Sequence, residues 1–348
     1  MKDGYITERQ TELYNCTFVK TILMLIVVLY HSILFWSRTW FVGEPVYSSN
    51  ILSITAKWMN SFHIYGFTLV SGYLFYFLKY EKGKYANFGP FIINKAKRLL
   101  IPYIFVSIVW AIPFSYLFYD ISVRDIIYEY AIGISPSQLW FLLMLFGVFI
   151  VFWLLSNFFE KHNVLGGLIV LLFYGVGLFG HYVLANYFQI FRACTYLTFF
   201  YIGFKIRQFG SQKLRCIPII IWLIFDIGLF VLYQYVQSYD GFIFTLVGLM
   251  IGFLLNIIGA ITAFLTLQKI ANRVKWHKSR VFSFISKNSM PVYLFHQQIV
   301  YVFIYLLNGV INPYLHATIN FVGAMIISLA ISAIMMKFKW TRFLIGEK

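Results

Sequence analysis

Long apolar runs alternate along the chain with short segments that carry most of the charged residues. Ten of these runs are long enough to cross a bilayer, because a hydrocarbon core of about 30 Å needs roughly 20 apolar residues per helix. The predicted spans are 17–37, 58–78, 99–119, 138–156, 164–180, 187–206, 216–236, 241–267, 288–308 and 315–337. The pattern therefore predicts an all-α integral membrane protein, a bundle of about ten transmembrane helices.

Composition excludes an ordinary water-soluble enzyme. Of the 348 residues, 61% are hydrophobic and only 11% are charged, and the mean hydropathy is +0.77. A soluble domain carries roughly 25% charged residues. The spans use nearly the whole chain, so we expect one transmembrane domain over 17–337, between the polar ends 1–16 and 338–348. The N-terminal end lacks the short apolar run and the cleavage site of a signal peptide, so the first span is expected to be retained.

The net charge of +16 and the isoelectric point near 9.6 allow two explanations, a nucleic-acid partner or membrane topology. Basic residues gather in 79–98, 205–215 and 269–287 and at both ends of the chain. The loops expected on the opposite side hold only Arg38, Lys57 and Arg124. Because cytoplasmic loops carry the excess of Lys and Arg, both termini are predicted to be cytoplasmic. Topology thus accounts for the charge, and no nucleic-acid partner is expected.

Ionisable groups deep inside predicted spans are costly and are candidates for function, and four such residues matter here. They are His31, His63, Asp226 and His296. At 1.5 Å per residue, His31 lies roughly 16 Å beyond Lys20 along the first helix, and His296 lies roughly 13 Å into the ninth. A neutral imidazole can take a proton from a hydroxyl group at ambient pH. The alternative is that these histidines only bind neighbouring helices by hydrogen bonds.

Three cations open the third span just before Pro102. Ammonium and guanidinium groups recognise phosphate, so Lys95, Lys97 and Arg98 are candidates to bind a nucleotide. The alternative is a topological anchor on lipid headgroups. Residues 88–97 combine apolar and basic positions and are predicted to form a short interfacial helix.

Six segments in chain order resemble the acyltransferase 3 family of integral-membrane acyltransferases. They are the basic residue and His of Lys20 to Ser32, the Ser71-Gly72-Tyr73 end of 62–74, the Lys95 to Tyr103 segment, Gln138 to Leu142, Phe200 to Gly203, and Lys287 to His296. Each match is short, and their number and order across the chain carry the resemblance.

The family has ten core helices, and its single-module members O-acetylate bacterial surface polysaccharides or their lipid-linked precursors. The resemblance therefore implies a multi-pass protein of the bacterial inner (plasma) membrane. Its acyl donor would be acetyl-CoA, a co-substrate rather than a permanently bound cofactor. The other partners would be a glycan or lipid-linked glycan and the bilayer.

The resemblance also implies roles for individual residues. His31 would act as general base or as transient acyl carrier, and His296 would orient the acceptor or stabilise the oxyanion. The expected phosphate-binding residues are Lys95, Lys97, Arg98 and Lys20. The expected substrate-binding residues are Trp140, His63, Ser71 and Tyr293.

The sequence departs from the family pattern in the first and third spans. Thr17 stands where the family usually has Asp, and Lys20 and Lys95 stand where it has Arg. Lysine keeps the charge but loses bidentate geometry on a phosphate. Two other functions remain open: a transporter or flippase of polysaccharide or lipid-linked sugar, and a polymerase or ligase of lipid-linked glycans. Repeated half-sequences, which mark many transporters, are not found, and the outer loops are short for a polymerase.

Overall fold

The computed structural model describes residues 8–38, 43–118, 121–210, 214, 216–274, 276 and 279–347. Within these residues the regular elements are helices and no strand is present. The chain forms two compact units. The first unit combines Met1–Tyr76 with Ile202–Lys287, and the second combines Phe77–Tyr201 with Asn288–Lys348. Each unit is therefore assembled from segments far apart in the sequence.

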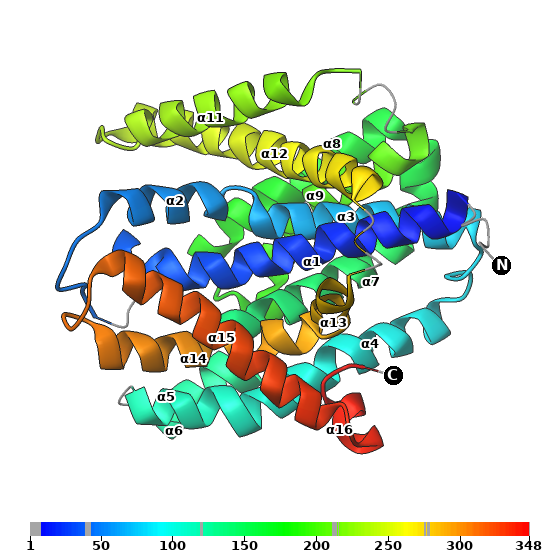
Figure 1. Ribbon diagram of the computed structural model, residues 1–348. Helices are drawn as coiled ribbons and strands as arrows, with labels where there is room; N and C mark the ends of the chain where they lie inside the picture. The colour runs from blue at the N-terminus through cyan, green and yellow to red at the C-terminus, as the bar shows by residue number, and fades with distance from the viewer. Residues whose placement is uncertain are drawn as a thin grey trace. The chain divides into compact units, whose positions relative to one another are not determined.

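In the first unit α1 is the central helix. It packs against α2, α3, α12 and α13, and α12 packs in turn against α3 and α11 (Figure 1). The hydroxyl of Ser49 caps α2 by accepting a hydrogen bond from the backbone N–H of Leu52. The helices are α1 (Glu8–Leu34), α2 (Asn50–Asn60), α3 (His63–Tyr76), α11 (Ile219–Val236), α12 (Phe242–Arg273), α13 (Arg280–Lys287) and the end of α9 (Ile190–Phe209).

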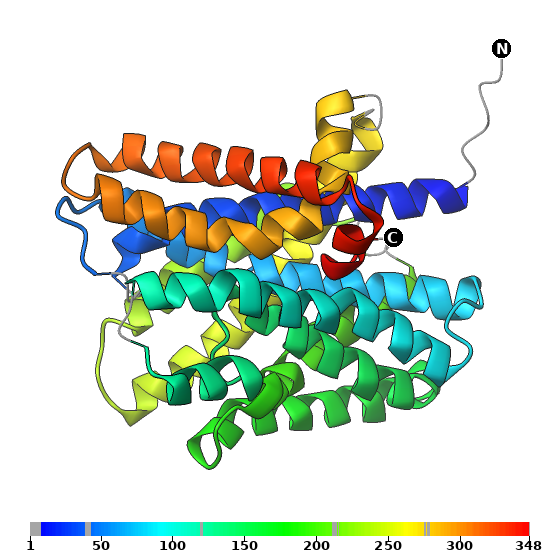
Figure 2. The same cartoon turned by 90° about the horizontal axis from the view of Figure 1, so that it is seen from below.

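In the second unit α14 and α15 form a tight helical hairpin, drawn in orange and red in Figure 2. Asn312 caps α15, and Pro313 follows at the first helical position, where its missing N–H costs no hydrogen bond. Helix α4 packs against α7, α14 and α16. The helices are α4 (Phe88–Val106), α5 (Ile112–Phe118), α6 (Val123–Ile126), α7 (Trp140–Lys161), α8 (Asn163–Phe179), α14 (Ser289–Leu307), α15 (Pro313–Met335), α16 (Lys339–Leu344) and the start of α9.

Short turns of other helical types join these elements. Three are π-helical, Phe77–Glu81, Ser107–Ala111 and Ile127–Ala131. Four are 3-10 turns, Phe35–Ser37, Ser137–Leu139, Gly180–Tyr182 and Tyr187–Gln189.

In the described part of the chain, seven helices are long and apolar enough to cross a membrane. They are Glu12–Ser37, Phe88–Phe118, Ser137–Lys161, Ile219–Val236, Phe242–Arg273, Ser289–Leu307 and Pro313–Met335. The other three predicted spans coincide with α3 and α8, which are shorter, and with α9, which is less apolar. The chain is thus a multi-pass membrane protein, while the count of about ten spans and the cytoplasmic termini stay predictions.

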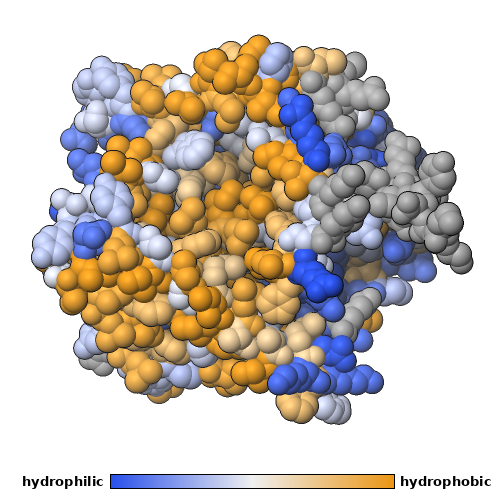
Figure 3. Space-filling model, viewed as in Figure 1, coloured by the Kyte–Doolittle hydropathy of each residue, from blue (hydrophilic) through white to orange (hydrophobic). Residues whose placement is uncertain are grey.

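The outer face of α11 and α12 is apolar. Ile224 on α11 is 63% exposed and Phe242 on α12 is 77% exposed. Figure 3 shows hydrophobic side chains over most of the surface of these helices, at the top of the view. Such a continuous apolar surface is typical of helices that face lipid.

Helix α4 is continuous through the segment that was predicted as a separate interfacial helix. It runs from Phe88 to Val106 and contains Pro102, whose ring leaves the carbonyl of Arg98 without its usual helical partner. Gly346 comes so close to this turn that a Cβ at Gly346 would lie 2.8 Å from the Arg98 oxygen. The segment expected as a polar end is therefore partly ordered, because α16 packs on α4.

Gly203 lets α9 and α3 meet backbone to backbone. A Cβ at this position would lie 1.9 Å from the carbonyl oxygen of Leu69 and 3.0 Å from the backbone nitrogen of Tyr73. No rotation of a side chain relieves contacts with backbone atoms. The glycine of the Phe200 to Gly203 segment is thus a packing requirement of the first unit.

We expect Gly203→Ala to destabilise the protein by about 1–3 kcal/mol, the usual cost of overpacking. Gly175→Ala is the matched control, because a Cβ there meets nothing within 4 Å. In an open helical position alanine is favoured over glycine by up to about 1 kcal/mol. The measurement is the apparent melting temperature in detergent, and equal shifts for the two variants would contradict the close approach of α3 and α9.

Candidate functional site

The candidate residues are distributed over both units. Lys20, His31, His63 and Ser71 belong to the first unit. Lys95, Lys97, Arg98, Trp140, Tyr293 and His296 belong to the second. Each set is described within its own unit.

His31 lies in the last turn of α1 and is half-buried. Its Nδ1 atom is 3.0 Å from the carbonyl oxygen of Val27, one turn earlier. A carbonyl can only accept, so Nδ1 carries the hydrogen and donates it. In the neutral ring, Nε2 is then the basic nitrogen. The helix itself thus fixes the tautomer that a base acting through Nε2 requires.

Tyr30 lies against both histidines of the first unit. Its ring centroid is 5.0 Å from that of His31 and 4.5 Å from that of His63. His63 is buried at the start of α3, and its Nδ1 donates to the carbonyl of Met59 at 2.6 Å. The structure therefore brings two of the predicted residues together around one aromatic ring, with the same nitrogen of each bound to backbone.

Ser71 and Asp226 each form a hydrogen bond within the first unit. The Ser71 hydroxyl is buried and donates to the carbonyl of Phe67 at 3.0 Å. Asp226 of α11 is 2% exposed, and one of its oxygens accepts a hydrogen bond from Trp58 Nε1 at 3.0 Å. Trp58 lies just before the break between α2 and α3 that precedes His63. Asp226 thus fastens α11 to the joint that positions His63.

A closed polar triangle joins α1, α3 and α9 in the first unit. Glu12 forms a salt bridge of 3.2 Å with Arg207, which also donates to the Tyr73 hydroxyl at 2.9 Å. That hydroxyl donates to the second Glu12 oxygen at 3.1 Å. Thr17, at the position of the usual family Asp, is exposed, and its hydroxyl donates to the carbonyl of Leu13 on its own helix. Glu12 therefore supplies a carboxylate in this region. In the sequence, the indication of this cluster was Tyr73, which lies in one of the family segments.

In the second unit His296 repeats the pattern of His31. It is fully buried in α14, and its Nδ1 is 2.8 Å from the carbonyl of Tyr293 and 3.2 Å from that of Val292. The basic nitrogen of the neutral ring is again Nε2. The Tyr293 hydroxyl donates to the backbone carbonyl of Gln138. His296 and Tyr293 are thus placed on one helix beside the turn that begins α7.

A network of glutamine side chains, which the sequence did not predict, surrounds this turn. Gln138 and Gln298 exchange two side-chain hydrogen bonds of 2.7 and 2.9 Å. Gln297 donates to the hydroxyl of Ser137 at 3.1 Å, and the backbone of Ser137 is left-handed with φ +48°. The Gln297 Oε1 atom is buried without a hydrogen-bond partner in the described part of the chain. This oxygen can accept a hydrogen bond from a hydroxyl group. In the sequence, the position of Gln297 directly after His296 was the feature that could have indicated its role.

Trp140 begins α7 and is half-buried. The guanidinium carbon of Arg192 lies 4.5 Å from the centroid of its ring, and the Tyr196 ring lies 5.7 Å away. A cation over an indole face stabilises the pair by about 0.5–1 kcal/mol at an exposed site, and Arg192 is exposed. The ring predicted to stack on a sugar thus already contacts a cation and a second aromatic ring.

The three cations of α4 do not share one environment. Lys95 Nζ lies 3.8 Å from the centroid of the Phe149 ring and 5.1 Å from that of Tyr85. Lys97 and Arg98 are exposed. The structure thus separates one lysine that packs on rings between α4 and α7 from two cations at the surface.

A second lysine, Lys79, also packs on an aromatic ring of α7. Lys79 lies over the Trp153 ring at 4.6 Å and donates to the Ser156 hydroxyl, and burial lowers its pKa. Trp153 Nε1 donates to the backbone carbonyl of Tyr85 at 3.0 Å. Burial raises the pKa of the Tyr85 phenol, which keeps its proton, while the charge of Arg98 opposes this shift. Lys79 was not among the predicted residues.

Comparison with known proteins identifies the family of the chain. A family model described as an acyltransferase domain, that of the acyltransferase 3 family, matches residues 14–337. The match covers nearly the whole chain and confirms the resemblance of the six segments. No curated protein and no solved structure matches the chain. Among the described residues, no group of three or more His, Cys, Asp or Glu side chains is placed to hold a metal ion.

We expect Glu12→Gln and Arg207→Gln each to lower the stability by about 1 kcal/mol, because each removes a charge-assisted bond from side chains about one-fifth exposed. The double variant should be little worse than either single one, since both changes break the same triangle. Thr17→Val on α1 is the control and should leave the apparent melting temperature unchanged. Additive losses in the double variant would show that the two side chains act independently.

Proposed function

The chain belongs to the acyltransferase 3 family, and we propose that it transfers acetyl from acetyl-CoA to a hydroxyl group of a bacterial surface polysaccharide or of its lipid-linked precursor. The family match supports acyl transfer by a membrane protein. The observation that carries the proposal further is the His31 imidazole, whose Nδ1 is bound to the Val27 carbonyl. This bond makes Nε2 the basic nitrogen, through which the ring would act as a base.

The proposed reaction needs one proton acceptor. Nε2 of His31 takes the proton of the acceptor hydroxyl as its oxygen attacks the thioester carbonyl. The tetrahedral intermediate then expels the CoA sulfur, which takes the proton from the imidazolium. The products are the acetyl ester and CoA thiol, and the ring returns to its starting tautomer. A transient acyl group on His31 is the alternative, and it would also form on Nε2.

The proposed donor site begins at α4. Lys97 and Arg98 are exposed and would bind the phosphates of the donor. Lys20, on α1 of the first unit, stays a predicted phosphate-binding residue. The ammonium of Lys95 lies over the Phe149 ring, so we assign Lys95 to holding α4 against α7. Substitution of Lys95 is therefore expected to change stability, whereas substitution of Lys97 or Arg98 is expected to change donor binding.

The proposed acceptor site uses α14 and the start of α7. Gln297 Oε1 can accept a bond from a sugar hydroxyl, and Trp140 with Arg192 offers an aromatic and cationic surface for a sugar ring. His296 would orient the acceptor through Nε2, which can accept a bond from its hydroxyl group, or would stabilise the oxyanion through Nε2 when the ring is protonated, because the Nδ1 hydrogen is already donated to the helix backbone. These groups recognise a polyhydroxylated acceptor, which supports a glycan.

We expect His31→Ala to lower the O-acetyl content of surface polysaccharide by about 10²- to 10⁴-fold, the contribution of a positioned acid–base group. The measurement is NMR of polysaccharide from cells with matched membrane levels of each variant. His162→Ala is the control, because His162 is an exposed histidine at the end of α7. Acetylation that survives in the His31 variant would make His31 a packing residue. No acetylation by the wild type, with a changed amount of glycan, would favour the transporter.

We expect Lys97→Gln and Arg98→Gln each to raise the KM for acetyl-CoA about two- to tenfold with kcat nearly unchanged, because exposed phosphate contacts are individually weak. Lys95→Met should instead lower thermal stability, since the cation–π contacts are lost. Lys161→Gln, another exposed lysine at a helix end, is the control. Steady-state kinetics with varied acetyl-CoA test the assignment, and an unchanged KM in both variants would move the donor site elsewhere.

A further inference from the structure

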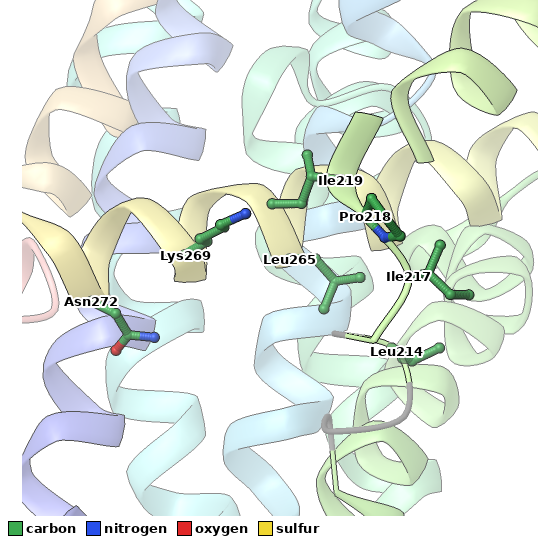
Figure 4. Close-up of a pocket in the computed structure, with 7 residues that line it drawn as sticks. All are labelled: Leu214, Ile217, Pro218, Ile219, Leu265, Lys269 and Asn272. Atoms are coloured by element: carbon green, nitrogen blue, oxygen red, sulfur yellow. The ribbon is translucent and has the colours of Figure 1, made fainter. Parts of the chain in front are cut away.

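A cavity of about 220 Å³ lies in the first unit, where the beginning of α11 meets the last turns of α12 (Figure 4). Lys269 and Asn272 of α12 form its polar end. Its remaining wall is apolar and consists of Leu214, Ile217, Pro218, Ile219 and Leu265. An apolar slot with a cation at one end matches a ligand that has a hydrocarbon part and an anionic part.

The polar end of this cavity offers hydrogen-bond donors. In Figure 4 the Lys269 ammonium points toward Ile219, and the Asn272 amide nitrogen lies on the side of the cavity. The Asn272 oxygen already accepts a bond of 2.6 Å from Asn15, which leaves that nitrogen to donate. Lys269 has no ion pair or hydrogen bond within the described residues. A group that only accepts, such as a phosphate diester, complements these donors.

The two stretches of sequence that line the cavity carry only basic charges, and the neighbouring carboxylate of Glu12 on α1 is paired with Arg207. Segments 161–225 and 241–346 contain no Asp or Glu, while 205–215 and 269–287 are rich in Lys and Arg. Charges of this kind at the end of a membrane-spanning helix attract anionic headgroups, by about 1 kcal/mol per cation near the surface.

The surface beyond the cavity distinguishes a lipid from a soluble anion. Ile220 and Ile224 on α11 are 61% and 63% exposed and continue the apolar wall along the helix. Lys269 lies one turn before the end of α12, at the depth where a span reaches the headgroups. An acyl chain that leaves the cavity therefore meets apolar surface.

We propose that this cavity is a binding site for an anionic phospholipid. Lys269 and Asn272 would hold its phosphate, and the first part of an acyl chain would lie against Ile217, Ile219 and Leu265. The bound lipid would join the start of α11 to the end of α12, which the sequence connects only through the far end of their hairpin. None of the residues that line the cavity is assigned to acyl transfer.

The test uses the purified full-length protein in detergent and measures its apparent melting temperature against added lipid. Phosphatidylglycerol should raise the melting temperature of the wild type more than phosphatidylcholine does. Lys269→Gln should weaken the apparent affinity for phosphatidylglycerol about fivefold, which corresponds to about 1 kcal/mol. Ile217→Asp, at a position 39% exposed, should abolish the preference by placing a carboxylate in the slot.

Lys161→Gln serves as the matched control, because it removes an exposed lysine from the end of another membrane-spanning helix. It should keep the preference for phosphatidylglycerol. An apparent affinity for phosphatidylglycerol that is unchanged in Lys269→Gln would overturn the proposal. So would an equal rise in melting temperature with inorganic phosphate alone, since the site would then bind a soluble anion rather than a lipid.

Discussion

Polar groups at membrane depth must find their partners inside the protein, and this constraint decides more of the structure than any other. Backbone groups meet it by forming helices. Small hydroxyl side chains meet it by donating to a carbonyl one turn earlier, as Ser32 and Thr68 do. His31, His63 and His296 meet it in the same way through Nδ1. For a serine the bond only removes the cost of burying an unpaired hydroxyl group, whereas for a histidine it also decides which ring nitrogen is basic.

Contacts between helices add specificity to this helical frame. The backbone contact at Gly203 requires α3 and α9 to approach at one register, and the Glu12, Arg207 and Tyr73 triangle then joins the same helices to α1. In the second unit the glutamine network performs the corresponding task between α7 and α14. Each unit therefore holds its candidate residues on helices that are fixed by direct bonds.

The sequence predicts the helices and the histidines well, because hydropathy and the rarity of ionisable groups are local properties. It predicts partners poorly. Tyr73 and Arg207 are 134 positions apart, and Gln138 and Gln298 are 160 apart, so no short pattern connects them. Lys95 has the same sequence character as Lys97, yet it turns toward the Phe149 ring of another helix. Hydropathy left α3 and α9 near the limit of a span for different reasons. Helix α3 is short, whereas Arg192 and Arg207, which contact Trp140 and Glu12 on other helices, lower the apolarity of α9.

The close approach of Gly346 to the Arg98 carbonyl has a consequence for the order of assembly. Pro102 leaves this carbonyl without a partner in its own helix, and the residue that covers it, Gly346, lies much further along the chain. Helix α4 is therefore synthesised well before the segment that packs on this turn. A fusion placed directly behind Gly346 would crowd the turn that carries Arg98.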